Sequence, residues 1–478
     1  KVEFMTTRFI PALTLAAASL LSACAAQTPA APAAKNVILF IGDGMGVSTV
    51  TAARIFDGQS RGLHGEEHVL SFEQFPNVAL VKTYNTNQQT PDSAGTATAM
   101  VTGTKTRAGV INIGPEVLRE DCEASLSNQL RSIGEIAKDR GTGVGFVTTT
   151  RVTHATPAVL YAHSPERDWE SDSETPQAEL ERGCTDIASQ LVSADIDVAL
   201  GGSRRSFFGA NNGGNRRGPD VNLAQDWLNA APNRRYVETA EELSELKPGE
   251  QVLGLFADSH MTYVAELPAD TTEPTLSAMT AAAISQLEKN ENGYFLMVEA
   301  GRIDHGHHDG KPGYALIETQ ALNEAVETTL SMVDLDDTLI LVTADHSHVF
   351  TLGGYSTRGS PILGYVVEND DRGEAKPGPD IALDGQPYTV LSYANGPGAI
   401  NELPRARPDT GVHAVVQSLV PVVNYGHDGS VNGQDETHGG EDVALYAIGP
   451  GSDAVRGVME QNLIFDIMMD ALRWNEAL

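Results

Sequence analysis

Three segments of this chain end an apolar, strand-like run in carboxylates or histidines. These runs lead to Asp43, to residues 299–308, and to Asp345 followed by His346. A fourth segment, residues 436–443, supplies another histidine. Open α/β sheets form their ligand sites where the strands end, so we expect these side chains to meet at one edge of a sheet. Carboxylate oxygens and imidazole nitrogens bind divalent cations, and this set can hold more than one ion. The sequence therefore predicts a hydrolase with several metal ions.

Strand-like and helix-like patterns alternate along most of the chain. The predicted strands span residues 37–41, 78–84, 143–148, 198–201, 252–256, 294–298, 338–343 and 443–448, and the clearest predicted helices span 275–289 and 314–333. This alternation predicts an α/β fold with a largely parallel central sheet and helices on both faces. Residues from about 353 to 432 break the alternation and are rich in glycine, proline and aspartate. We expect them to form a small inserted surface subdomain with a short strand at 388–393.

The charge of the chain limits its partners. The formal net charge is −32 over 478 residues, which excludes a typical nucleic-acid-binding protein because such proteins need basic patches. An anionic substrate would have to be attracted by local positive charge, such as bound metal ions, against the field of the whole protein.

The N-terminal residues are predicted to direct export. Residues 1–4 precede Met5 and are interpreted as a vector-derived remnant, and residues 5–24 resemble a lipoprotein-type signal peptide with Arg8 before an apolar stretch. This segment ends in Leu-Ser-Ala-Cys24, so Cys24 would carry the lipid, and residues 25–34 would be a Pro/Ala-rich tether. The alternative is an ordinary signal peptide cleaved nearby. Either interpretation predicts a periplasmic or cell-surface protein, and residues 35–478 are expected to form its folded domain.

Two cysteines remain, Cys122 and Cys184. In an exported protein such a pair is most simply a disulfide. Two unpaired thiols are the alternative. Metal binding is not expected, because neither cysteine has a cysteine or histidine at ligand spacing.

Ser93 is the candidate nucleophile. It precedes a run of small helix-forming residues, so it is expected near a helix N-terminus, where backbone N–H groups and the helix dipole favour anions. A metal ion beside Ser93 would lower the pKa of its hydroxyl. The alternative is a serine that only caps the helix.

Five segments resemble the motifs of the alkaline phosphatase family, in the family's order along the chain. They are Phe40–Gly46, Pro91–Ala99, Val298–His308, Val342–His348 and Glu436–His438. The resemblance covers nearly the whole chain after residue 35. It implies a homodimeric, metal-dependent hydrolase that releases phosphate from a broad range of phosphate monoesters through a phosphoserine intermediate.

The resemblance also implies a role for each matching residue. It assigns two Zn²⁺ and one Mg²⁺ to each chain, in a third site that other divalent ions can enter. The implied ligands are Asp304, His308 and His438 for the first zinc, Asp43, Asp345 and His346 for the second, and Asp43, Thr156 and Glu299 for the third site. Ser93 would be the nucleophile, and Arg167 would grip two phosphate oxygens. The alternative is that Arg167 is a solvated surface arginine, because nothing else in its local sequence distinguishes it. Four residues would orient these groups without binding an ion, namely Asp92, His154, His305 and His348.

Two features indicate which branch of the family the chain is similar to. His154 and His305 resemble the animal enzymes, whereas the enterobacterial type has aspartate and lysine there; the pair Cys122 and Cys184 is also similar to an animal-type disulfide. Ala257 departs from the animal pattern, because it replaces a carboxylate of a peripheral calcium site, and this leaves a fourth metal open. Six further histidines are expected to be surface or structural residues, namely His64, His68, His163, His260, His413 and His427.

Two other functions stay open from the sequence. Related enzymes that act on phosphate diesters or sulfate esters share the metal ligands but differ in nucleophile and substrate clamp. A non-catalytic lipoprotein that binds metal or phosphate would lack the nucleophile. The combination of Ser93 with Arg167 favours a monoesterase over both.

Overall fold

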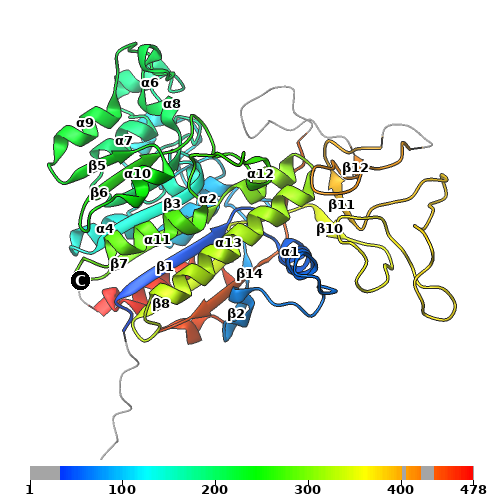
Figure 1. Ribbon diagram of the computed structural model, residues 1–478. Helices are drawn as coiled ribbons and strands as arrows, with labels where there is room; N and C mark the ends of the chain where they lie inside the picture. The colour runs from blue at the N-terminus through cyan, green and yellow to red at the C-terminus, as the bar shows by residue number, and fades with distance from the viewer. Residues whose placement is uncertain (1–32, 401–404, 421–434, 477–478) are drawn as a thin grey trace, which may run out of the picture. The chain divides into compact units, whose positions relative to one another are not determined.

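The computed structural model describes residues 33–400, 405–420 and 435–476 (Figure 1). The predicted signal peptide, Cys24, all but the last two residues of the predicted tether, and His427 lie outside the described residues. Within the described part of the chain, no helix is both long enough and apolar enough to cross a bilayer.

A ten-stranded sheet forms the centre of the fold. Its strands, in order across the sheet, are β15 (Gly457–Glu460), β2 (Asn77–Lys82), β14 (Val443–Ile448), β8 (Thr338–Ala344), β1 (Asn36–Gly42), β7 (Tyr294–Ala300), β3 (Gly143–Arg151), β4 (Val198–Gly202), β6 (Gln251–Leu255) and β5 (Arg234–Val237). All neighbouring pairs are parallel except those of β14, which runs antiparallel to β2 and to β8. The largely parallel sheet predicted from the sequence is therefore confirmed.

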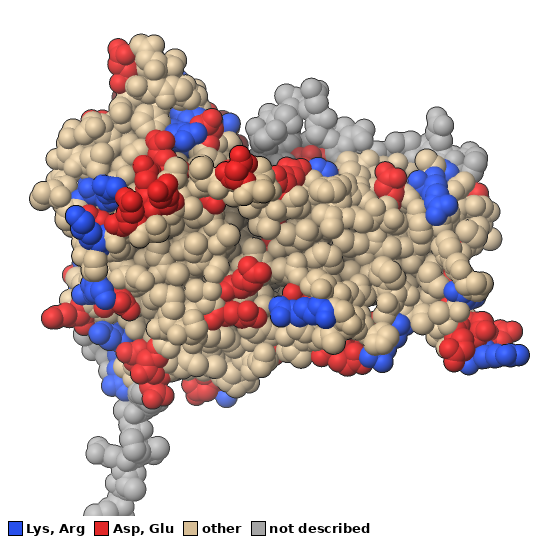
Figure 2. Space-filling view, viewed as in Figure 1, with Lys and Arg blue, Asp and Glu red and all other residues tan. Residues whose placement is uncertain are grey.

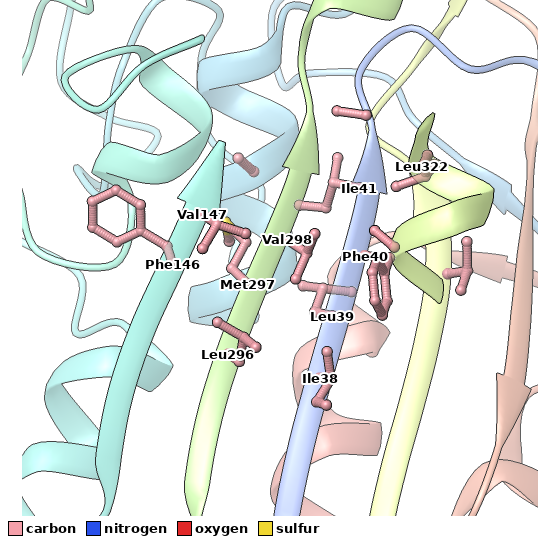
Figure 3. Packing of buried hydrophobic residues seen from close by; sticks show 14 of the residues in the cluster. Ile38, Leu39, Phe40, Ile41, Phe146, Val147, Leu296, Met297, Val298 and Leu322 are labelled. Atoms are coloured by element: carbon pink, nitrogen blue, oxygen red, sulfur yellow. The ribbon is translucent and has the colours of Figure 1, made fainter. Parts of the chain in front are cut away.

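Helices cover the sheet on both faces. In Figure 1, α11 (Leu276–Leu287) and α13 (Pro312–Met332) lie in front of the sheet, and Figure 3 shows α2 (Ser93–Thr102) and α14 (Leu463–Ala471) behind it. The central strands β1, β7, β8 and β3 are buried along their whole length. Burial on both faces explains why their sequences are continuous apolar runs without polar alternation.

The core fills the space between the central strands and these helices. Figure 3 shows Ile38 and Phe40 of β1, Val298 of β7 and Phe146 of β3 in this core, with Leu322 reaching in from α13. These five side chains are fully buried. Complete burial is worth roughly 1.5–3 kcal/mol for each large apolar side chain. The core thereby fixes the ends of the central strands, where the polar residues gather.

Two smaller sheets lie outside the central one. β10 (Phe350–Leu352), β11 (Leu391–Asn395) and β12 (Ser418–Val420) form a three-stranded sheet in the region of the predicted subdomain, seen at the right of Figure 1. β11 begins three residues later than the predicted strand at 388–393. β9 (Ser347–His348) pairs antiparallel with β13 (His438–Gly439), which brings the fourth predicted metal-binding segment back to the central sheet.

Acidic side chains are spread over the face seen in Figure 2, with lysines and arginines between them. The described residues of this face show no large continuous basic area. This agrees with the low pI of about 4.6 and leaves local charges to attract an anion.

Candidate active site

The candidate site lies at the carboxyl ends of four adjacent strands. Asp43 follows β1, Glu299 lies near the end of β7, Asp345 follows β8, and His154 comes three residues after β3. Because β8, β1, β7 and β3 are neighbours in the sheet, their ends bring these side chains together. The placement expected from the sequence is observed.

A tight turn after β1 lets two parts of the site approach closely. Gly44 has a φ of +68°, and a β-carbon there would lie 2.4 Å from the ring of His348. The Gly44 amide donates a hydrogen bond to Asp345 Oδ1 at 3.0 Å. Only glycine fits this position, because both the left-handed backbone and the lack of space exclude a larger residue.

Asp304, His308 and His438 meet in a first cluster. α12 (Arg302–His308) starts directly after β7 and places Asp304 and His308 one turn apart on the same side. His308 Nε2 lies 3.3 Å from Asp304 Oδ1, and His438 Nε2 lies 3.4 Å from the same oxygen. The two Nε2 atoms are 3.1 Å apart. The three residues implied as ligands of the first zinc therefore converge.

A second cluster surrounds His346. Its Nε2 lies 3.4 Å from Asp43 Oδ1 and 3.3 Å from Asp345 Oδ2. The same nitrogen is 3.2 Å from Ser93 Oγ. Asp43, Asp345 and His346 are fully buried, and Ser93 is 2% exposed. The candidate nucleophile therefore lies against the residues implied for the second zinc.

The histidines of both clusters are turned to present the same nitrogen. In each of the three, Nδ1 faces a backbone carbonyl: His308 faces that of Glu436 (2.6 Å), His346 that of Ser347 (3.2 Å) and His438 that of Pro91 (2.8 Å). An Nδ1–H that donates to a carbonyl leaves the lone pair on Nε2. Each Nε2 points at the carboxylates, as a metal ligand requires.

His348 connects two buried carboxylates. Its Nε2 lies 2.7 Å from Asp304 Oδ1, and its Nδ1 is hydrogen-bonded to the Glu436 carboxylate. Burial opposes a charge on this ring, but Glu436 and Asp304 outweigh burial and raise the pKa of His348 to about 10. A charged His348 donates to both carboxylates, and this geometry suits the orienting role expected from the sequence.

A third cluster lies beside Asp43. Asp43, Glu299 and His154 each offer one ligand atom, all within 4.8 Å of one another. The hydroxyl of Thr156, in the short helix α5 (Ala155–Ala158), lies beside Glu299 and lowers its pKa. Thr148 donates a hydrogen bond to Oε2 of Glu299. The residues implied for the third site are therefore together as well.

Several buried carboxylate oxygens of these clusters have no hydrogen-bond donor from the described residues. Both oxygens of Asp43, Oε1 of Glu299 and Oδ2 of Asp345 are buried and accept no hydrogen bond from the described residues. Burial, with repulsion between the acids, raises the pKa of Asp43 and of Asp345. Burial, partly offset by the Thr148 hydroxyl, raises the pKa of Glu299 to about 7. Uncompensated buried carboxylates are costly, and divalent cations remove that cost. The donor set therefore fits bound metal ions.

Arg167 is held by Asp92, the residue before the candidate nucleophile. Its Nη1 donates to Asp92 Oδ2 at 3.2 Å, and its Nη2 donates to His154 Nε2 at 2.9 Å. Asp92 also caps α2, since its Oδ1 accepts from the Gly95 amide at 3.1 Å. Although burial opposes the charge of Arg167, Asp92 and the other nearby carboxylates raise its pKa. Arg167 is thus a charged group held between Asp92 and His154 and not a freely solvated surface residue.

The comparisons with known proteins agree with this geometry. The family profile described as alkaline phosphatase matches residues 34–474. The chain belongs to the alkaline phosphatase family. It is 46% identical to the tissue-nonspecific alkaline phosphatase of Gallus gallus over 451 residues, which cover 90% of this chain and 83% of that protein. It is 42% identical to an alkaline phosphatase of Gadus morhua, over 90% of each chain.

Solved structures give the same result. The alkaline phosphatase of the Antarctic bacterium TAB5 superposes with a TM-score of 0.62 at 25% identity, over 93% of this chain and 99% of that one. The alkaline phosphatase of Thermus thermophilus superposes with a TM-score of 0.65 at 25% identity, over 92% of each chain. The protein is therefore an alkaline phosphatase, a metal-binding hydrolase of phosphate monoesters.

The disulfide predicted in this alkaline phosphatase is confirmed. Cys122 and Cys184 are bonded, with their Cα atoms 6.0 Å apart. The bridge packs against the buried ring of Trp169. It joins segments that are 62 residues apart in the sequence.

Ala257, the residue that departs from the animal-type calcium pattern, lies beside Arg204. The backbone amide of Arg204 donates to the carbonyl of Ala257 at 2.9 Å. The guanidinium of Arg204 lies 2.8 Å from Asp258 Oδ1 and 3.5 Å from Glu238 Oε2. Among the described residues, none of the three candidate metal clusters includes these side chains. The donor set here does not fit a fourth metal ion.

Two histidines have contacts that the sequence did not indicate. His307 is buried and bridges Tyr393 Oη of β11 (2.7 Å) and Thr49 Oγ1 (2.9 Å). His260 was expected at the surface or in a structural role, but its ring packs against those of His154 and His305 beside the third cluster. Its sequence neighbours contain no ligand motif, so only the fold reveals this position.

Proposed function

We propose that this alkaline phosphatase hydrolyses its substrates in two displacements, with Ser93 as the nucleophile. The observation that carries the proposal is the 3.2 Å contact of Ser93 Oγ with His346 Nε2 at the start of α2. In the first step, Ser93 Oγ forms a bond to phosphorus, the bond from phosphorus to the substrate oxygen breaks, and the alcohol leaves with a proton. In the second step, water attacks the phosphoserine, the bond to Ser93 breaks, and serine regains its proton as phosphate leaves.

The surrounding residues would hold the phosphoryl group. Arg167 would donate two parallel hydrogen bonds to phosphate oxygens, a geometry that a guanidinium favours. Asp92 would keep Arg167 charged and oriented. Backbone N–H groups at the N-terminus of α2 add to the local positive potential that an anion needs in this acidic protein.

We infer two Zn²⁺ and one Mg²⁺ per chain, held by the three ligand sets named above. When bound, the ions would lower the pKa of the attacking hydroxyl groups and neutralise the charge of the phosphoryl group. The imidazole-containing clusters suit zinc, and the oxygens of Asp43, Thr156 and Glu299 suit magnesium. The solved histidine-to-aspartate variant of the TAB5 enzyme has magnesium in its M3 site.

We also propose that the protein is exported, lipid-anchored through Cys24, and dimeric. The proposed chain consists of a signal peptide (5–24), a tether (25–34) and the alkaline phosphatase domain (35–478). The disulfide supports export, because such bonds persist in oxidising compartments. Metabolic labelling with a radioactive fatty acid, compared between the natural chain and Cys24→Ala, tests the anchor.

Rates on three nitrophenyl esters test the proposed reaction. We expect the zinc- and magnesium-loaded enzyme to hydrolyse the phosphate monoester far faster than the phosphate diester or the sulfate ester. A faster rate on the diester or the sulfate would assign the protein to a different activity. Tight metal and phosphate binding without hydrolysis of any of the three would indicate a binding protein.

A further inference from the structure

His260 lies beside the third cluster although no ligand motif includes it. It follows β6, and the amide of the next residue, Met261, donates to the carbonyl of Thr149 in β3 at 3.0 Å. The ring of His260 packs edge-on against that of His305, with centroids 4.2 Å apart, and its centroid is 5.6 Å from that of His154. The centroids of His154 and His305 are 6.0 Å apart. The three imidazoles form one wall, which we call the imidazole wall.

Each ring of the imidazole wall accepts a hydrogen bond from an arginine. The pairs are Arg167 with Nε2 of His154 (2.9 Å), Arg302 with Nδ1 of His305 (2.7 Å) and Arg151 with Nε2 of His260. A guanidinium has only donors and stays charged, so the ring nitrogen must be the acceptor. In a neutral imidazole the second nitrogen then carries the proton. Each ring is therefore held in one tautomer.

The tautomer of His305 decides whether it can bind a cation. Its Nδ1 lone pair is engaged by Arg302, which is itself held over the ring of Tyr263 at 3.6 Å. Its Nε2, 4.0 Å from Asp304 Oδ2, then carries the proton and has no lone pair in the ring plane for a metal ion. His305 could become a ligand only if its ring turned or if Arg302 released it.

His260 opposes such a turn. It packs against the His305 ring at an interplanar angle of 67°, and it is fixed from its other side by Arg151. Arg151 is buried and forms a close ion pair with Glu170, at 2.6 Å. The His260 ring is therefore anchored to a rigid group and not to a mobile side chain.

We propose that His260 is a positioning residue for the third metal site: it holds the His305 ring turned toward Arg302 and so keeps the His305 imidazole out of the coordination of the bound ion. This inference rests on the proposed third metal site. The consequence is that the third site selects magnesium over zinc or cobalt. An ion bound by the oxygens of Asp43, Thr156 and Glu299 alone meets hard donors, which magnesium prefers, whereas an added imidazole favours zinc or cobalt.

Removing the ring of His260 should weaken that selectivity. His260→Ala leaves space beside His305, so the ring can turn and offer nitrogen to the third ion. We expect the ratio of zinc to magnesium in the third site to rise by about tenfold at fixed free concentrations, as for other residues that orient metal ligands. His260→Phe keeps a ring against His305 and should retain the natural ratio. His64→Ala, at an exposed histidine that belongs to none of the three metal clusters, is the control for histidine loss.

The measurement is the metal content of each variant after equilibration with buffered zinc and magnesium. Equal zinc-to-magnesium ratios in the natural chain, His260→Ala and His260→Phe would overturn the proposal. A loss of selectivity in His260→Phe equal to that in His260→Ala would also overturn it, because the ring contact would then not matter.

A second measurement separates failure of this inference from failure of the site itself. Manganese added to the zinc-loaded enzyme should enter the third site, and pulsed electron paramagnetic resonance should detect no coordinated nitrogen that disappears in His305→Gln. A coordinated nitrogen in the natural chain that is lost in His305→Gln would refute the role of His260 and leave the third site intact. Manganese binding that is unchanged in Glu299→Gln would refute the third site, and the inference with it.

Discussion

The guanidinium of Arg167 donates a hydrogen bond to Nε2 of His154, at 2.9 Å. This bond joins the proposed phosphate clamp to the third metal site, because His154 lies within ligand distance of Asp43 and Glu299. Burial and the nearby arginines, Arg167 first among them, hold the pKa of His154 well below its usual range. A neutral ring in place of a carboxylate leaves less negative charge around the third ion.

The first prediction follows from that missing charge. The double substitution His154→Asp with His305→Lys should raise the affinity for magnesium by about tenfold, because a carboxylate beside the site attracts the hydrated ion. Turnover should fall, because tighter hydrogen bonds around bound phosphate slow its release. Magnesium titration of metal-depleted, zinc-reloaded enzyme measures both effects. Superimposable activation curves and equal maximal rates would show that the two histidines have no influence on the ion.

The second prediction concerns the nucleophile. Ser93→Ala should keep the zinc and magnesium content and lose activity by about a thousandfold or more, as for nucleophiles of other hydrolases. Ser331→Ala, at an exposed position of α13, is the matched control and should retain the full rate. Steady-state kinetics on a nitrophenyl monoester, together with metal analysis of the same samples, tests both the loss of activity and the retained metal content. Unchanged kinetics in Ser93→Ala would eliminate the assignment.

The third prediction concerns the disulfide. Replacing Cys122 and Cys184 by serine should lower the free energy of unfolding by about 4 kcal/mol, the value that the chain-entropy model gives for a loop of this length. The metal content should not change, because the bridge packs on Trp169 and contacts none of the three metal clusters. Urea unfolding of the oxidised, reduced and double-serine forms measures the effect. Equal stability of all three would contradict a stabilising role.

The central sheet could be predicted from the sequence because its strands are buried on both faces. A strand such as β1, Asn36–Gly42, must be apolar throughout, and such runs stand out between amphipathic helices. The edge strands β5 and β15 were not predicted. β5 is Arg-Arg-Tyr-Val and β15 is Gly-Val-Met-Glu, and sequences this short and polar become strands only because a neighbouring strand offers hydrogen bonds.

The residues of the candidate site also divide into those that could be predicted from the sequence and those that could not. Asp43, Asp345 and His346 stand directly after predictable strands, so their convergence follows from the topology of parallel sheets. His260 stands in a loop whose position depends on packing against β3 and α12. Neither spacing nor composition carries that information, and its contact with His305 appears only in three dimensions.

The fourth prediction is that calcium does not stabilise this enzyme. The carboxylate expected for the animal-type calcium site is replaced by Ala257, and the guanidinium of Arg204 bridges the nearby Asp258 and Glu238. A fixed positive charge there repels a second cation. Millimolar calcium added to the zinc- and magnesium-loaded enzyme should shift the melting temperature by no more than about 1 °C, because a ligand that does not bind the folded state cannot stabilise it. A larger rise that a calcium-selective chelator reverses would reveal a calcium site despite Arg204.

The last prediction concerns the pH dependence of the metal-free protein. The pKa of Glu299 is raised from its ordinary value of 4.5 to about 7, because the carboxyl is fully buried and lies near Asp345. Between these pH values the folded state binds a proton that the unfolded state does not bind. The free energy of unfolding should therefore fall as the pH rises from about 5 to about 7, by an amount on the order of 3 kcal/mol for this group. Asp43 and Asp345, whose pKa values are also raised, act in the same direction.

Glu318 provides the matched control for this prediction. It is also buried, its pKa is likewise raised to about 7 by burial, and it accepts a hydrogen bond from the Val264 amide away from the metal clusters. Urea unfolding should be measured from about pH 5 to 8, with chelator and with bound metals. Glu299→Gln should flatten the pH dependence of the metal-free protein only, since a bound cation keeps Glu299 ionised in the loaded protein. Glu318→Gln should flatten it in both forms. If Glu299→Gln instead changes the two forms equally, then Glu299 is a structural carboxyl that is not coupled to metal binding.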